Sequence, residues 1–133
     1  MRPARVVIAM MVLTVLVACG ETGGARTVKI GMRYSRFEPA VVHARAGETI
    51  RFELRNDDPI DHEFVLGDEE AQQSHERASG DDHDAVPGEA FLEPGEVQVL
   101  TYRFDKAGEV LYGCHRPGHY AFGMRGLVRV AES

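Results

Sequence analysis

The feature that most constrains this 133-residue chain is a short run of chemically distinctive side chains near its C-terminus. Between two segments that alternate like strands, Cys114, His119 and Met124 follow one another with the spacing Cys-x4-His-x4-Met. A Pro-Gly pair at residues 117–118 supplies a turn within this stretch. Because a loop of this kind can bring a thiolate, an imidazole and a thioether to one point, we expect these three side chains to converge.

The donor types in this loop point to a particular metal. A thiolate and two imidazoles in one plane, with a thioether bound weakly on the axis, suit copper as it changes between its two oxidation states. The best candidate for the second imidazole is His62, which follows a loop over residues 57–61 and opens the next apolar segment. We therefore predict one copper site formed by His62, Cys114, His119 and Met124. A lone Cys or Met is more often a packing residue, so the prediction rests on the combined pattern.

Alternation of apolar and polar residues predicts strands through most of the chain. Apolar side chains occupy every second position of segments 27–34 and 49–55, which is the period of a half-buried strand. Further short apolar runs are separated by Gly-containing turns and occupy residues 39–43, 63–66, 97–104, 109–114 and 127–130. This spacing predicts an all-β protein built as a β-sandwich.

One segment, residues 67–88, breaks the strand pattern. It holds seven acidic side chains and almost no large apolar residue, so we expect an irregular acidic loop with a short helix near residues 69–77. His75 and His83 lie in this segment beside carboxylates and are candidates for a second, weak metal site. Solvated loop side chains are the alternative interpretation.

The first eighteen residues have the composition of an export signal. Two arginines precede an apolar run over residues 6–18, which is shorter than the roughly 20 residues of a membrane span. The run ends in Leu-Val-Ala-Cys-Gly, which resembles the lipobox of bacterial lipoproteins, where lipid is attached to the cysteine. We predict a signal peptide over residues 1–18, a tether over residues 19–26 lipidated at Cys19, and one domain over residues 27–133. A signal peptide cut elsewhere and an uncleaved anchor are the alternatives, and all three place the domain outside the cytoplasm.

Charge and cysteine content narrow the class of partner. The formal net charge is −6 at pH 7, and removal of the first eighteen residues takes away two arginines and no acidic residue. An acidic chain without a basic face cannot neutralise a phosphate backbone, so we expect no nucleic-acid partner. If Cys19 is lipidated, Cys114 has no thiol to pair with outside the cytoplasm, and a bound metal would protect it from oxidation.

With this ligand pattern on these strands, residues 27–130 resemble a cupredoxin, and the Cys-x4-His-x4-Met spacing is similar to that of rusticyanin and auracyanin. The resemblance implies a Greek-key β-sandwich with one type 1 copper near one end. It places His62 on an early loop and the other three ligands on the last one. Many cupredoxins follow the first histidine with an asparagine that ties the two ligand loops together, whereas here Glu63 follows His62, so that tie is left open.

Residues around the four ligands have further expected places. His115 is adjacent to Cys114 but points to the opposite side if the strand continues, so we predict a surface or loop residue rather than a ligand. Residues 120–122 flank His119 and can form an apolar collar around its exposed edge, with simple loop packing as the alternative. His43 is expected on the surface of a strand.

These features predict one-electron transfer by a monomeric, membrane-tethered shuttle on the periplasmic or outer face of a bacterial membrane. Copper sequestration or delivery is the alternative. The expected partners are a redox protein, such as a cytochrome or a membrane oxidoreductase, and the membrane itself through the lipid anchor. We do not expect an enzyme, because a multicopper oxidase needs a cysteine between two histidines, whereas Gly113 precedes Cys114.

Overall fold

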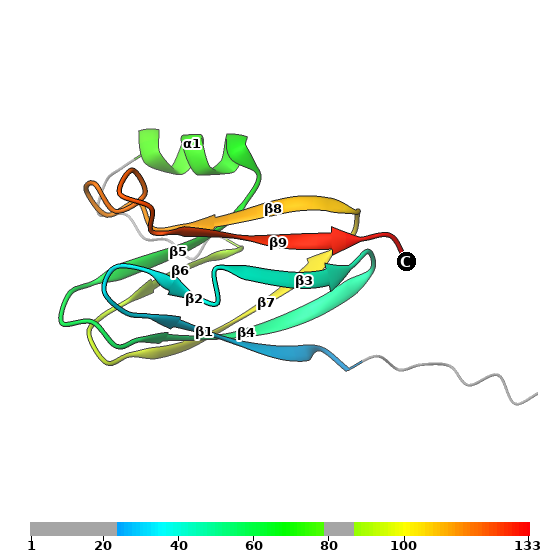
Figure 1. The fold of residues 1–133 in the computed structure, drawn as a ribbon, viewed down its shortest axis with the longest axis horizontal. Coiled ribbons are helices and arrows are strands. Elements are labelled where there is room, and N and C mark those ends of the chain that lie inside the picture. The colour runs from blue at the N-terminus through cyan, green and yellow to red at the C-terminus, as the bar shows by residue number, and fades with distance from the viewer. Residues whose placement is uncertain (1–23, 79–86) are drawn as a thin grey trace, which may run out of the picture.

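A computed structural model describes residues 24–78 and 87–133 and shows two β-sheets packed face to face (Figure 1). The strands of the first sheet, in spatial order, are β2 (Phe37–Glu38), β1 (Arg26–Met32), β4 (Glu48–Asn56) and β7 (Val97–Phe104). Those of the second are β3 (Val41–Arg45), β9 (Arg125–Ala131), β8 (Gly108–Gly113), β5 (His62–Gly67) and β6 (Glu89–Leu92). The predicted all-β sandwich is confirmed.

The core lies between the two sheets and follows the predicted alternation. On β4, Ile50, Phe52 and Leu54 are completely buried, while the residues between them are only partly covered. From the opposite sheet, the ring of Phe64 contacts Phe52 with the centroids 5.7 Å apart. It stacks on the ring of Tyr112 of β8 at 5.2 Å. Aromatic packing of this kind fixes the relative position of the strands that carry the ligands.

One short helix, α1 (Glu69–Arg77), lies over the outer face of the second sheet, as Figure 1 shows, and confirms the predicted helical turn. Asp68 caps its first turn by accepting a hydrogen bond from the backbone N–H of Ala71 at 2.9 Å. Gln72, a residue of α1, is buried, and its side-chain amide donates to the backbone oxygen of Val65 on β5 at 2.8 Å. Because α1 covers one face of β5 and the first sheet covers the other, every residue of β5 is buried.

The structure corrects the ends of the predicted strands. The alternation predicted a strand continuing to Tyr34, which is wrong: β1 ends at Met32, and Tyr34 lies in a turn with a φ of 53° and is 77% exposed. At its other end β1 includes Arg26, one residue before the predicted start. The short strands β2 and β6 were not predicted. No helix in residues 24–78 and 87–133 is long and apolar enough to cross a membrane.

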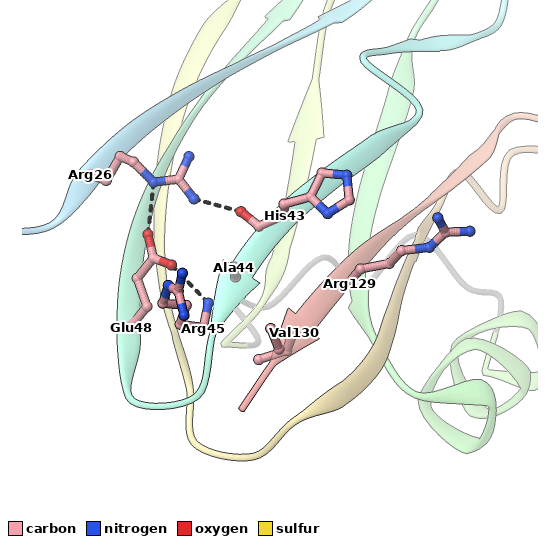
Figure 2. A pocket seen from close by; sticks show the side chains of 8 residues that line it. Arg26, His43, Ala44, Arg45, Glu48, Arg129 and Val130 are labelled. Carbon is pink, nitrogen blue, oxygen red and sulfur yellow. Dashed lines mark hydrogen bonds and ion pairs between the residues drawn. The ribbon is translucent and has the colours of Figure 1, made fainter. Parts of the chain in front are cut away.

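The end of the sandwich where β1 begins lies opposite the loop that joins β8 to β9 (Figure 1). Figure 2 shows the polar contacts there, which surround a hollow of about 570 Å³. The guanidinium of Arg26 donates to Glu48 and to the backbone oxygen of His43, both at 2.7 Å. Glu48 also accepts the backbone N–H of Arg45 at 2.9 Å. These bonds join strands of both sheets, and His43 lies exposed on β3 as predicted.

Candidate metal centre

Three predicted ligands meet at the end of the sandwich where β5 begins. The Cys114 sulfur lies 3.9 Å from Nδ1 of His62 and 3.4 Å from Nδ1 of His119. One donor atom from each residue lies within 4.8 Å of the other two, the single group of three such donors among the described residues. His62 and Cys114 are completely buried, while His119 is partly exposed.

Strand pairing explains this convergence. In the second sheet β8 pairs with β5 on one side and with β9 on the other, both antiparallel, and Gly113 stands opposite Arg125. Cys114 and Met124 therefore extend the same ladder by one step, and the Cys114 N–H donates to the Met124 oxygen at 3.1 Å. The Met124 N–H in turn donates to the His119 oxygen at 2.8 Å. Met124 is completely buried in the same core cluster as Cys114.

The chemistry of these donors fits copper. Burial raises the pKa of the Cys114 thiol to about 11, so a thiolate in this pocket needs a bound cation to compensate its charge. Burial, together with the neighbouring His62 and Arg116, lowers the pKa of His119, which favours the neutral imidazole that binds metals. A buried thiolate with two imidazoles and a nearby thioether is a soft donor set that suits copper.

Asp58, which the sequence analysis did not single out, contacts the ring nitrogen of His62 that lies away from Cys114. Its carboxylate lies 2.8 Å from Nε2 of His62, which leaves Nδ1 facing Cys114. It also accepts the backbone N–H groups of Tyr34 at 2.7 Å and Ser35 at 2.8 Å, two residues with positive φ. Burial alone would raise the pKa of Asp58, but the hydrogen bonds from Ser35, His62 and Tyr34 together hold it below its ordinary value. Carboxylates placed in this way orient ligating histidines.

Asn56 is a second residue that the sequence analysis missed. It is completely buried at the end of β4, and its side-chain amide donates to the backbone oxygens of Ile60 at 2.8 Å and Leu92 at 3.1 Å. Its side-chain oxygen accepts the Asp58 N–H at 3.0 Å. The amide therefore fixes the loop that presents both Asp58 and His62. The available signal was a polar residue at an inward position of an apolar strand, two places after Leu54.

Glu63 connects the two segments that carry the predicted ligands by hydrogen bonds. Its backbone N–H donates to the Cys114 sulfur at 3.3 Å, and its carboxylate accepts the backbone N–H of His115 at 3.2 Å. The residue after the first histidine therefore does join the two loops, with a carboxylate in place of the asparagine amide. Because β5 and β8 are paired neighbours in the second sheet, the segments that carry these residues lie close together.

His115 lies in the loop after β8, one of the two positions predicted for it, but its side chain is covered. Its side chain is only 2% exposed, because it lies beneath α1 with Nε2 at 2.8 Å from the Gln72 side-chain oxygen. Its ring stacks on that of Tyr120, one of the residues of the predicted collar, with the centroids 4.7 Å apart. Phe122 remains on the surface and is 78% exposed. Of the two positions predicted for His115, the loop is therefore confirmed and the surface is not, and the residue lies outside the group of three donors.

The predicted second metal site stays a prediction. His83 lies outside the described residues. His75 lies on α1, with its ring nitrogens 3.4 Å from a carboxylate oxygen of Glu63 and 3.2 Å from one of Glu89. Both nitrogens of His75 therefore already face carboxylates.

Comparison with known proteins agrees with the fold and the site. Residues 6–126 match the model of the family described as "Cupredoxin-like domain", and the chain belongs to this family. Its donor set is consistent with one type 1 copper as the cofactor.

Two relatives carry the same printed name, "Copper-resistant cuproprotein CopI". The protein from Rubrivivax gelatinosus is 39% identical over 109 residues, which are 79% of this chain and 66% of the relative. The chain thus spans just under two thirds of that relative. The protein from Pseudomonas aeruginosa is 30% identical over 138 residues, which cover 80% of this chain and 76% of the relative.

Solved structures share the fold. Auracyanin B superposes with a TM-score of 0.67 and 26% identity, covering 80% of this chain and 89% of that one. The reduced auracyanin of Roseiflexus castenholzii gives a TM-score of 0.66 at 23% identity, covering 81% and 99% of the two chains. At 23% identity, the similarity to the Roseiflexus castenholzii protein shows a shared fold only.

Replacement of Asp58 by Asn should weaken copper binding about 10- to 100-fold, because His62 would lose the carboxylate that orients its ring. The measurement is competition for Cu(II) with a chelator, followed by the thiolate–copper absorption. The matched control is Asp57→Asn, since Asp57 pairs with Arg55 on the surface next to the same loop. An unchanged dissociation constant in a folded Asp58→Asn protein would contradict this role.

Proposed function

We propose that this protein holds one type 1 copper with His62, Cys114, His119 and Met124 and exchanges single electrons through it. The observation that carries the proposal is the prearranged donor group, with the Cys114 sulfur 3.4 and 3.9 Å from two imidazole nitrogens. Copper bound there would supply a one-electron change of oxidation state. Because Asp58 and the Glu63 N–H already hold His62 and the sulfur in place, the protein would need little rearrangement when an electron moves.

The exposed edge of His119 favours a carrier over an enzyme. His62, Cys114 and Met124 are completely buried, so they leave no open position for a small substrate. His119 instead lines a surface hollow of about 390 Å³ together with Ile60, which is 47% exposed. A redox protein, such as a cytochrome or a membrane oxidoreductase, would contact this edge directly. Electrons would then pass through the His119 imidazole.

Loading with one equivalent of Cu(II) should give an intense visible absorption band from thiolate-to-copper charge transfer, and Cys114→Ser should abolish it. Voltammetry of the loaded protein should show reversible one-electron reduction, with a spectrum unchanged after repeated cycles. A protein that stays colourless with Cu(II), or that releases its copper on reduction, would rule out the proposed carrier.

We further propose that this electron exchange serves copper tolerance. The support is the printed name of the two relatives, copper-resistant cuproproteins that are 39% and 30% identical to this chain. Sequestration or delivery of copper is the competing way to provide tolerance. The carboxylates and histidines of residues 68–84 were its main support in the sequence.

Deletion of the gene should make the host bacterium sensitive to copper, and expression of the wild-type chain should restore growth. Cys114→Ser should not restore it, because the copper site loses its thiolate. Asp57→Asn, a surface change beside the site, should restore growth fully. Equal rescue by wild type and Cys114→Ser would show that tolerance does not depend on this site.

We propose that the domain works outside the cytoplasm on a lipid attached to Cys19, with an acidic surface and no nucleic-acid partner. The support is the signal-like sequence of residues 1–18 and the small polar residues that follow. β1 begins at the end of the sandwich away from the loop that joins β8 to β9 (Figure 1), and this loop carries His119 in the sequence, so a tether there would leave the site facing away from the membrane.

Cys19→Ala should move the protein from the membrane fraction to the soluble extracytoplasmic fraction, because the sulfur that carries the lipid is lost. Immunoblots of separated fractions measure this. Retention of the variant in the membrane would instead indicate an uncleaved anchor.

A further inference from the structure

Glu63 places a buried carboxylate against the backbone of the residue that follows the candidate ligand Cys114. The residue is 7% exposed, and its backbone N–H reaches the Cys114 sulfur at 3.3 Å. Its carboxylate accepts the N–H of the next residue, His115, at 3.2 Å. The charged group therefore lies within a few bonds of the sulfur, in a part of the molecule from which water is largely excluded.

His75 of helix α1 contacts the same Glu63 carboxylate. Nε2 of His75 lies 3.4 Å from the Glu63 carboxylate oxygen, and Nδ1 lies 3.2 Å from Glu89 on β6. The ring of His75 also lies beside that of His115, with the centroids 5.3 Å apart. Through Glu63 and His115, the helix thus contacts residues adjacent to both His62 and Cys114.

We propose that Glu63 is a positioning residue whose charge lowers the reduction potential of the copper centre, and that α1 holds this charge in place through His75. A negative charge favours the more positive of two oxidation states, and the effect is larger where water is excluded. This inference rests on the proposed copper site, and it identifies a residue that sets the reduction potential of that site.

The tie between the loops does not itself require a charge. A neutral amide of the same shape would accept the His115 N–H equally well through its oxygen. The carboxylate therefore adds a negative charge to a hydrogen bond that Gln could also make.

The test measures the reduction potential by spectroelectrochemical titration of the copper-loaded full chain. Glu63→Gln should keep the visible absorption band and raise the potential above that of wild type. The matched control is Glu89→Gln, which removes the same charge from the far side of His75, and its shift should be clearly smaller. An unchanged potential in Glu63→Gln, or an equal shift in Glu89→Gln, would overturn the proposal.

The contribution of α1 is tested by a double-mutant cycle. His75→Ala should shift the potential in the wild-type background and leave it unchanged in the Glu63→Gln background, because the helix acts through the carboxylate. Equal shifts in both backgrounds would overturn that step. If Glu63→Gln fails to bind copper, the reduction potential of His75→Ala is the deciding measurement. A His75→Ala protein with the wild-type potential would contradict the proposal. Absence of the band in wild type would instead refute the copper site, so the two failures are distinguishable.

Discussion

The pairing of β8 with β5 on one side and with β9 on the other determines where every candidate ligand lies. It brings the start of β5, which carries His62, beside the end of β8, which is followed by Cys114. The ladder between β8 and β9 closes the loop after Cys114 at Met124. The stacked rings of Phe64 on β5 and Tyr112 on β8 hold these two strands together in the close-packed core. The donor residues next to them are therefore held at fixed positions.

Two buried carboxylates distinguish the surroundings of the candidate site. Asp58 holds the far nitrogen of His62 and is itself held by backbone N–H groups of Tyr34 and Ser35. Glu63 holds the peptide that follows Cys114 and faces His75 on α1. Each carboxylate therefore links a candidate ligand, or the residue next to one, to a distant element: the turn after β1 for Asp58 and the helix for Glu63. A change in either element can therefore reach the candidate site through a single carboxylate side chain.

The sequence predicted the sandwich, the helix over residues 69–77 and the approach of Cys114 and His119, because strand period and the spacing within one loop are local patterns. The addition of His62, 52 residues before Cys114, depended on the type of donor that was missing and on the resemblance to a family. The contacts of Asp58 and Asn56 could not be read in this way, since Tyr34, Ser35 and Leu92 are brought to them by tertiary folding alone. The burial of the His115 side chain was missed for the same reason, because α1 covers the face on which this loop residue lies. The strands β2 and β6, of two and four residues, are too short to show a period.

The burial of the donors bears on how this protein would provide copper tolerance. Delivery requires that an acceptor reach the ligands and replace them one by one, yet His62, Cys114 and Met124 are completely buried, and the Cys114 sulfur accepts a hydrogen bond from the Glu63 N–H. The proposed electron exchange needs no such access, because an electron would pass through the exposed edge of His119. Phe122 and Ile60 add apolar surface to this part of the molecule, which favours a brief contact with a protein partner. The arrangement thus favours electron exchange over delivery, and the proposed role in tolerance would follow from the redox chemistry of copper that stays bound.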